Sequence, residues 1–204
     1  MSVKDDGVDF SDPGLHGAKE KAPKHDAPAH HDSGGAGSHH DTAHSYKGAI
    51  FPLFHPPQAD FHTGARYFGA PRSGGRIHAA VDLIAPYLSP IRAIADGHVI
   101  QPPYYFYLGT NALEVNHGKY GVVRYGEISS AKVIHLGSGH HVKKGEVIAY
   151  VGLLDGLGWS MLHFELYKGT AHGALTNVGN PPYQRRSDLV NPTHFMEGLL
   201  RAAF

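Results

Sequence analysis

The apolar residues of this chain, from about residue 46 onward, fall in short runs bounded by glycine and proline, and no long run of helical period competes with them. Runs of roughly four to eight residues that are rich in Val, Ile, Tyr and Phe, with frequent turn signals between them, are typical of antiparallel β domains. The predicted strands are 79–84, 91–100, 112–116, 121–125, 147–151 and 162–167. The sequence therefore predicts a mainly β fold, an antiparallel sheet or β-sandwich-like core, with one short C-terminal helix at 192–204.

Residues 1–46 have a different composition, which is rich in Gly, Ala, Ser, Asp and His and nearly free of large apolar side chains. They contain seven of the 18 histidines. Such a segment cannot bury enough apolar surface to offset its ordering entropy, so we predict a disordered tail. Its His-Asp clusters either bind metal loosely or are simply solvated. The predicted domains are this tail at 1–46 and a folded domain at 47–204, which is long enough to bury a sizeable core.

The bulk composition argues against several classes of function. Lys and Arg together number 18, and so do Asp and Glu, so no basic excess favours nucleic acid or an anionic membrane surface. The chain has no cysteine, which rules out disulfides and thiolate chemistry. The first residues lack the apolar stretch of a signal peptide, and no apolar run approaches the roughly 18 residues of a membrane span. We therefore expect a protein made in the cytoplasm, without a Sec address or a membrane span.

Two short runs, about eighty residues apart, carry residue types that bind metals. The run 76–83 contains His78 and Asp82, and the run 160–166 contains His163. Because alternate side chains of a strand share a face, His78 and Asp82 are expected to point one way while their apolar neighbours face the core. The same alternation holds in the second run. Two such strands side by side would bring two imidazoles and one carboxylate together.

Three protein ligands with a fourth position left to water are the pattern of a catalytic zinc site, whereas structural sites usually have four side-chain ligands, often cysteines. The pattern therefore favours a hydrolase with one zinc ion held by His78, Asp82 and His163. A His-x3-Asp spacing is weak evidence in a chain with 18 histidines. A histidine in an apolar strand is also often a hydrogen-bonded structural residue, so the spacing alone leaves both interpretations open.

The motifs around these two runs resemble those of the lysostaphin-type (LytM-like) zinc metallopeptidases, which cut bacterial peptidoglycan. The resemblance covers roughly residues 50–196, and the matching segments keep the family's order: 64–69, 75–83, 90–99, 115–118, 123–127, 142–152 and 160–166. It implies the lysostaphin-type fold, one Zn²⁺ per chain and peptidoglycan stem peptides as the substrate. It also implies that His78, Asp82 and His163 are the zinc ligands, and all three are present.

Two positions depart from the family pattern. Met161 stands where the family has the first histidine of its His-x-His pair, and Glu127 stands where it has the histidine of its Tyr-x-His-Leu hairpin. In the family those two histidines assist the zinc-bound water and the transition state. A carboxylate can also act as a general base, so Glu127 is predicted to be the catalytic base. The alternative is a surface carboxylate at a strand end.

Met161 cannot donate a hydrogen bond, so it either packs in the core or leaves the oxyanion without its usual donor. The candidate replacements are Tyr104, Tyr105, Tyr107 and His135. The three tyrosines belong to an aromatic run that either packs against the core or forms one wall of a substrate groove.

Three further charged residues are open to two interpretations each. Glu165, two residues after His163, either orients that ligand or forms an ion pair. Arg185 and Arg186 are expected to be solvated, or else to meet substrate carboxylates.

The leading function is a zinc-dependent peptidoglycan endopeptidase that cleaves an amide bond in the stem peptide or cross-link through metal-activated water. The alternatives are an N-acetylmuramoyl-L-alanine amidase with the same zinc site, a non-catalytic peptidoglycan-binding or regulatory module, and metal sequestration by the tail. Peptidoglycan lies outside the cytoplasmic membrane, so the missing signal peptide predicts a non-Sec route to the periplasm or cell wall. Delivery to rival bacteria as an antibacterial effector would fit, for example through a type VI secretion apparatus and with a cognate immunity protein, and so would a phage-associated lysin.

Overall fold

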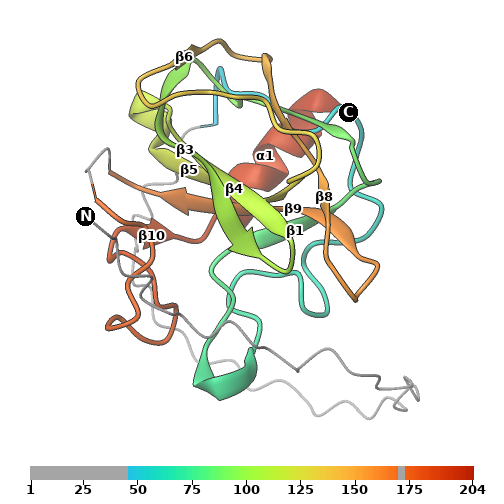
Figure 1. The fold of residues 1–204 in the computed structure, drawn as a ribbon, viewed down its shortest axis with the longest axis vertical. Coiled ribbons are helices and arrows are strands. Elements are labelled where there is room, and N and C mark those ends of the chain that lie inside the picture. The colour runs from blue at the N-terminus through green and yellow to red at the C-terminus, as the bar shows by residue number, and fades with distance from the viewer. Residues whose placement is uncertain (1–45, 170–172) are drawn as a thin grey trace, which may run out of the picture. The chain divides into compact units, whose positions relative to one another are not determined.

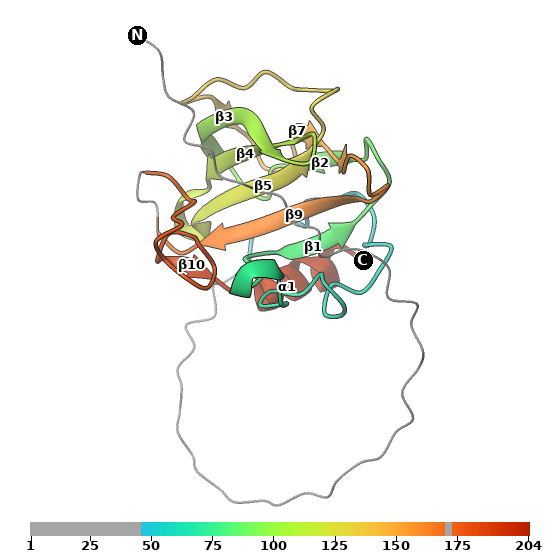
Figure 2. The same cartoon turned by 60° about the horizontal axis from the view of Figure 1, so that its bottom comes forward.

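Strand β9 (Ser160–Tyr167) lies at the centre of the fold, with strands paired along both of its edges (Figures 1 and 2). The computed structural model describes residues 46–169 and 173–204. The other strands are β1 (Val81–Ile84), β2 (Pro90–Arg92), β3 (Gly97–Tyr107), β4 (Thr110–Asn116), β5 (Val122–Ile128), β6 (His141–Val142), β7 (Val147–Tyr150), β8 (Gly152–Leu153) and β10 (Leu189–Val190). The described helices are α1 (Thr193–Ala203) and two short 3-10 helices, Ser73–Gly75 and Gly118–Tyr120.

The main sheet has eight strands in the order β1-β9-β5-β4-β3-β6, with β8 and β10 also paired to β9. Strands β2 and β7 form a separate pair, and every pairing is antiparallel. Figure 2 shows β1, β9 and β5 side by side, so three segments that are far apart in the sequence meet here. The predicted mainly β, antiparallel fold class is confirmed.

One face of β9 packs into the core. Leu162, Phe164 and Leu166 are at most 1% exposed and belong to the main hydrophobic cluster, as the strand alternation predicts. Val81 and Leu83 of β1 join the same cluster. The intervening side chains of β9 point to the other face, and this face carries the polar residues described below.

One predicted strand, 91–100, is two strands in the structure, because the chain bends between β2 and β3 and passes from one sheet to the other. Strand β3 then continues to Tyr107 through Pro102 and Pro103. Proline cannot donate to a ladder, but beyond His98 this strand pairs with β4 alone, and its register shifts between Gln101 and Tyr104. The aromatic run 104–107 is therefore the end of a strand and not a connection.

Helix α1 packs on the core and lies beside the first described residues. Phe195, Met196 and Leu199 belong to the main cluster. A Cβ atom on Gly198 would lie 2.4 Å from the Tyr46 ring, so the two ends of the described domain are in contact. The predicted C-terminal helix is confirmed and is one residue shorter at each end than expected.

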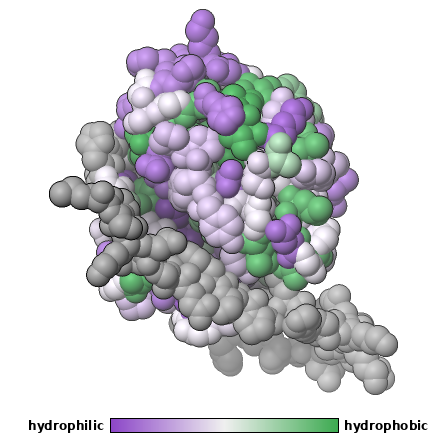
Figure 3. Space-filling model, in the orientation of Figure 1, coloured by the Kyte–Doolittle hydropathy of each residue, from purple (hydrophilic) through white to green (hydrophobic). Residues whose placement is uncertain are grey.

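The chain divides after Ala43, and His44–Phe204 forms one compact unit. The predicted tail at 1–46 lies outside the described residues except for Tyr46. Within 46–169 and 173–204, no helix has the length and apolarity needed to pass through a bilayer. Figure 3 shows hydrophobic residues interspersed with hydrophilic ones on the visible part of one face.

Candidate metal centre

His78, Asp82 and His163 converge on one point beside β1 and β9, and all three are buried. His78 Nε2 lies 3.2 Å from Asp82 Oδ1 and 3.3 Å from His163 Nδ1, and His163 Nδ1 lies 2.9 Å from Asp82 Oδ1. Zinc bonds of about 2.0–2.2 Å in a tetrahedron place neighbouring ligand atoms roughly 3.3 Å apart. The spacing of the three atoms therefore fits one zinc ion.

The strand register explains why two of these residues meet. Asp82 in β1 is paired directly with His163 in β9, and cross-strand neighbours on one face have Cβ atoms about 4.5–5.5 Å apart. His78 was expected in the same strand as Asp82, but β1 begins only at Val81. Its backbone is held instead by the preceding loop, because His78 N–H donates to the carbonyl of Ala70 at 2.8 Å.

Each histidine has an acceptor at its outer nitrogen. His78 Nδ1 lies 2.9 Å from the Tyr67 carbonyl oxygen, and His163 Nε2 lies 3.0 Å from Glu165 Oε1. Because these oxygens only accept, both outer nitrogens carry a proton, and the inner nitrogens of the neutral rings are left with lone pairs. Two lone pairs and a carboxylate oxygen then face one another, an arrangement that a cation between them stabilises.

In the absence of a metal, a proton takes this place. Burial alone would lower the pKa of His163, but its hydrogen bonds to Asp82 and Glu165 raise the pKa to about 9. Burial acts against ionised Asp82 as well, but His78 and His163 hold the pKa of that carboxyl well below its usual range. A metal ligand must be deprotonated, so a metal has to displace the proton on His163, and metal affinity is expected to rise with pH.

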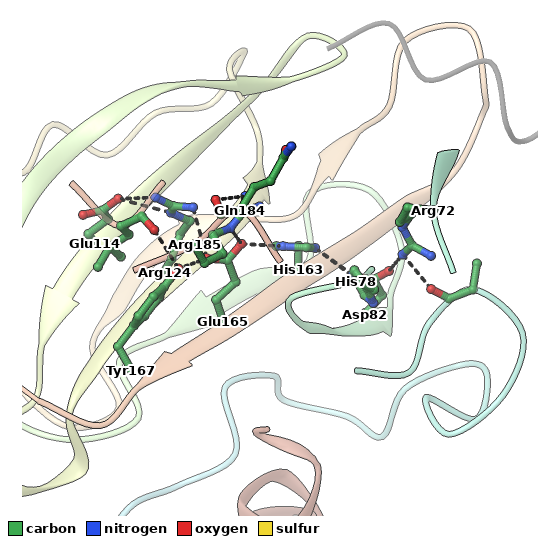
Figure 4. Close-up of polar contacts among 12 residues, drawn as sticks. Arg72, His78, Asp82, Glu114, Arg124, His163, Glu165, Tyr167, Gln184 and Arg185 are labelled. Atoms are coloured by element: carbon green, nitrogen blue, oxygen red, sulfur yellow. Dashed lines mark hydrogen bonds and ion pairs between the residues drawn. The ribbon is translucent and has the colours of Figure 1, made fainter. Parts of the chain in front are cut away.

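Glu165 fixes the outer side of His163 within a buried network of charges (Figure 4). Its Oε1 accepts a hydrogen bond from Arg185 Nε at 2.8 Å, and its Oε2 accepts from Arg124 Nη1 at 3.0 Å and from the Tyr167 hydroxyl. Burial would raise the pKa of Glu165, but the two arginines hold it well below its usual range. The carboxylate therefore stays ionised and fixed, so it both orients the ligand and forms ion pairs.

The network continues away from the centre to Glu114 and Tyr104. Arg124 donates from Nε and Nη2 to Glu114 Oε1 at 3.1 and 3.0 Å, and the Tyr104 hydroxyl donates to the same oxygen at 2.7 Å. Burial, together with the neighbouring Glu114, raises the pKa of Tyr104. Its hydroxyl hydrogen is thus already bonded within the protein, which argues against Tyr104 as the donor to an oxyanion.

Neither Tyr105 nor His135, two other residues proposed as donors, is brought to the centre by a described contact. Tyr105 is 66% exposed, and His135 is exposed in a loop. Phe106 is the aromatic residue that reaches the centre, since its ring lies 5.5 Å from the ring of His163. The sequence prediction missed Phe106, although strand alternation places it on the same face of β3 as Tyr104 and opposite to Tyr105.

The expectation that Arg185 and Arg186 are solvated is wrong. Arg185 pairs with buried Glu165, and Arg186 Nε lies 2.6 Å from Asp188 Oδ1. Both arginines serve the structure around the centre. A pair of neighbouring arginines carries no sequence signal that distinguishes this role from a solvated one.

Glu127 is buried at the end of β5, next to Gly126, which is paired with His163. It is 7% exposed, and its Oε2 has no hydrogen-bond partner among the residues that the structure describes. Its φ of 57° lies in the left-handed region, which is uncommon for a residue other than glycine. Burial, followed by the charge of Asp82, raises the pKa of Glu127 to about 8. A strained backbone and an unpartnered buried acid are features of functional sites and do not fit a surface carboxylate.

Met161 is buried on the same face of β9 as His163. A cation that the sequence did not reveal lies near Asp82. Met161 is 9% exposed and is paired with Ile84 of β1 and Gly152 of β8. Arg72, from the loop before β1, places Nη2 3.8 Å from Asp82 Oδ2 (Figure 4). No spacing rule connects Arg72 with the ligand motif, so only the fold reveals this contact.

Comparison with protein families agrees with this geometry. The model of Peptidase family M23 matches residues 76–176, a stretch that contains all three converging side chains. Comparison with curated proteins returns no match.

Solved structures with the same fold include lysostaphin from Staphylococcus simulans. The chain is 20% identical to the catalytic domain of this antimicrobial peptidase, with a TM-score of 0.50. The match covers 66% of the present chain and 90% of the lysostaphin domain. Against a longer lysostaphin chain the identity is 20% and the TM-score is 0.52. This match covers 69% of the present chain and 52% of the lysostaphin chain. A lytM protein from Ruminococcus gnavus ATCC 29149 is 20% identical, with a TM-score of 0.51, and the match covers 76% of the present chain and 61% of the lytM chain. The chain thus spans about half the length of the longer lysostaphin chain.

Proposed function

We propose, from the premise that the chain belongs to peptidase family M23, that it is a zinc-dependent peptidoglycan endopeptidase which cleaves an amide bond in the stem peptide or cross-link. One observation carries the proposal. Two imidazole lone pairs and a carboxylate oxygen converge on a single point, next to the buried carboxylate of Glu127, whose Oε2 has no hydrogen-bond partner among the described residues.

His78 Nε2, His163 Nδ1 and Asp82 Oδ1 would hold the zinc ion. A donor set of two neutral imidazoles and one carboxylate suits zinc, and it leaves a position for water. When bound, zinc lowers the pKa of that water towards about 7 and polarises the scissile carbonyl.

Glu127 acts as the general base and then as the general acid. It takes one proton from the attacking water as the water oxygen bonds to the amide carbon, and it delivers this proton to the nitrogen as the C–N bond breaks. The products are a carboxylate and an amine. No hydrogen bond from the described residues competes for Glu127 Oε2. A divalent cation beside Asp82 also offsets the charge that raises the pKa of Glu127, which brings that pKa from about 8 towards neutral.

For the substrate, we propose an apolar contact at Phe106. Its half-buried ring lies against His163 and can present a flat surface beside the reacting bond. Tyr105 alternates to the other face of β3 and is 66% exposed, and the Tyr104 hydroxyl is bonded to Glu114. Phe106 is therefore the aromatic residue of this run that we propose for the substrate contact.

The test is digestion of purified muropeptides, followed by mass spectrometry of the products, with and without a metal chelator. We expect fragments that have gained one water at a broken amide bond, and we expect the chelator to abolish them. Asp82→Ala serves as the inactive control. Intact muropeptides after incubation with the zinc-loaded protein would refute the proposal and favour a binding module.

The same products separate the two hydrolase alternatives. An endopeptidase leaves a shortened peptide attached to the muramic acid, whereas an N-acetylmuramoyl-L-alanine amidase releases the whole stem peptide from the sugar. The delivery route, a type VI apparatus and an immunity protein stay predictions.

A further inference from the structure

The proposed site lacks a donor for the negative charge that amide hydrolysis creates. When water adds to an amide, the carbonyl oxygen gains charge, and enzymes place hydrogen-bond donors at this oxygen. His78, Asp82 and His163 all point acceptors at the centre, and Glu127 is an acid whose role is proton transfer. Met161 has no hydrogen to donate.

The guanidinium of Arg72 is the cation that the fold brings to the centre. Its Nη2 lies 3.8 Å from Asp82 Oδ2, while Asp82 Oδ1 faces the two histidines. The positive charge of Arg72 also opposes the raised pKa of Glu127, so it acts on the proposed base as well as on a ligand. In Figure 4 the labelled polar residues form a row. Arg72 lies at one end of it, next to His78 and Asp82, and Arg124 lies on the opposite side of His163.

The loop around Arg72 fixes the guanidinium but leaves part of it available. Nη2 donates to the Ala65 carbonyl at 2.7 Å, and Nη1 donates to the Pro71 carbonyl at 3.3 Å. The side chain is 21% exposed, and Nε–H has no hydrogen-bond partner among residues 46–169 and 173–204. A guanidinium has five N–H groups, so donors remain for a ligand. The 3.8 Å contact with Asp82 is too long for a hydrogen bond, so that ion pair does not occupy an N–H group of Arg72.

We propose that Arg72 donates a hydrogen bond to the scissile carbonyl oxygen as it gains charge, and so supplies the stabilisation that Met161 cannot give. This inference rests on the proposed function of the same site. Arg72 keeps its proton throughout, because the pKa of a guanidinium is far above the working pH. Its part is electrostatic, and the proton transfers remain with Glu127.

The kinetic test compares Arg72→Ala with the zinc-saturated wild type on purified muropeptides. Removing one donor of this kind typically costs about 10²–10³ in kcat, and we expect that loss with little change in KM and about one zinc per chain. Arg72→Lys, which keeps one donor, should recover part of the rate, and it carries the test if the alanine variant does not fold. The matched control is Arg66→Ala, because Arg66 is a partly buried arginine of the same loop whose Nε donates to a backbone carbonyl, that of Asp60.

Three kinetic outcomes would overturn the inference. One is a kcat within about threefold of wild type in Arg72→Ala. Another is a rise in KM alone, which would make Arg72 an anchor for a substrate carboxylate. The last is weaker zinc binding with a normal kcat at saturating zinc, which would make it a positioning residue for Asp82.

A second measurement does not depend on turnover. Inorganic phosphate is a tetrahedral oxyanion, so its affinity for the zinc-loaded protein, measured by calorimetry, reports the donor directly. We expect Arg72→Ala to weaken phosphate binding about tenfold or more and Arg66→Ala to leave it unchanged. If wild type cleaves no muropeptide while Arg72→Ala still loses phosphate affinity, the substrate assignment fails and the donor assignment stands. Equal phosphate affinity in Arg72→Ala and wild type refutes the donor assignment.

Discussion

Two buried glutamates flank His163, the proposed zinc ligand in β9, and their surroundings are opposite. Glu165 accepts hydrogen bonds from two arginines, a tyrosine and His163, and its pKa is held well below the usual range. Glu127 has a side-chain oxygen without a hydrogen-bond partner among the described residues, and burial raises its pKa to about 8. Both side chains are at most 7% exposed, so burial alone does not account for the difference.

The difference separates a structural acid from a chemical one. A fully bonded carboxylate is rigid and resists protonation at any ordinary pH, so Glu165 can hold a ligand but cannot shuttle a proton. An unbonded carboxylate whose pKa lies near neutrality can both gain and lose a proton. Glu127 also has a strained backbone, a cost that the surrounding sheet has to offset. The following experiments test this contrast, beginning with the largest expected effect.

Loss of a proposed zinc ligand should remove the chemistry that Glu127 is proposed to carry out and that Glu165 supports by orienting His163. We expect His163→Ala and Asp82→Ala to bind no zinc at micromolar metal and to show no detectable turnover, because two ligands do not retain the ion. Zinc content by mass spectrometry and muropeptide digestion measure both effects. His62→Ala is the control, since His62 is a partly exposed histidine of the same chain bonded to Asp60 and Glu197. Retention of one zinc by Asp82→Ala would contradict the assigned ligand set.

Replacement of the unbonded acid should affect the rate and not the fold. We expect Glu127→Gln to lose about 10²–10⁴ in kcat, as is typical when a general base is removed. Its zinc content should stay near one, and its free energy of unfolding should not fall, because the amide removes an acid whose ionisation is disfavoured by burial. Kinetics and thermal unfolding of the same sample provide both measurements. A kcat close to wild type would exclude Glu127 from the mechanism.

Replacement of the bonded acid should have the opposite outcome. Glu165→Ala leaves Arg124 buried with one of its two carboxylate partners and Arg185 with none among the described residues. Breaking a buried pair in this way costs about 3–5 kcal/mol, measured by chemical denaturation. Zinc affinity should also fall about 10–100-fold, because the orientation of His163 is no longer fixed. Unchanged stability would show that the network is not the support that we describe.

The two acids should also respond to pH with opposite signs in the metal-free protein. The folded-state pKa of Glu127, about 8, exceeds its ordinary value of 4.5, so the folded protein retains a proton that the unfolded chain releases. Stability therefore falls as the pH rises from about 4.5 to 8, and the gain from Glu127→Gln grows across this window and is constant above it. The pKa of Glu165 is lowered, so its contribution is present above about pH 4.5 and is lost as the pH falls below that value. Denaturation curves of wild type and variants at several pH values test both signs.

The smallest effect is expected at the far end of the network. Glu114→Gln keeps an oxygen that can accept from Arg124 and Tyr104 but removes the charge. We expect a loss of about 1–3 kcal/mol in unfolding free energy and a zinc affinity within about twofold of wild type. A large loss of zinc would mean that the centre is coupled to the whole network and not to Glu165 alone.

Local alternation in the sequence was sufficient for the longer strands and for the polar faces that carry Asp82 and His163, whereas the proposed ligand set came from the family resemblance. Leu162, Phe164 and Leu166 predicted the buried face of β9, and the residues between them predicted the polar face. The two-residue strands β6, β8 and β10 escaped prediction because two residues carry no period. The predicted strand at 91–100 is wrong in one respect, because the chain passes there from one sheet to the other. That change of sheet is set by packing and not by composition.

The surroundings of the centre could not be predicted, because they depend on contacts between distant segments. Arg124 meets Glu165 from 41 positions away, and the contact between Phe106 and His163 depends on the register of several strands. Arg72 reaches Asp82 through the shape of a loop that has no periodic pattern. The sequence shows that residue 127 is an acid, but only the fold shows that Glu127 Oε2 has no hydrogen-bond partner among the described residues.

The contact between Tyr46 and Gly198 has a practical consequence for engineering. The beginning and the end of the described domain meet at α1, while the proposed ligands lie in β9, in β1 and just before β1. A short peptide could therefore join the two ends of this unit, and new ends could be opened in an exposed connection, giving a circular permutant with the proposed site intact. For the same reason, the unit is suited to insertion as a cassette within a loop of a carrier protein.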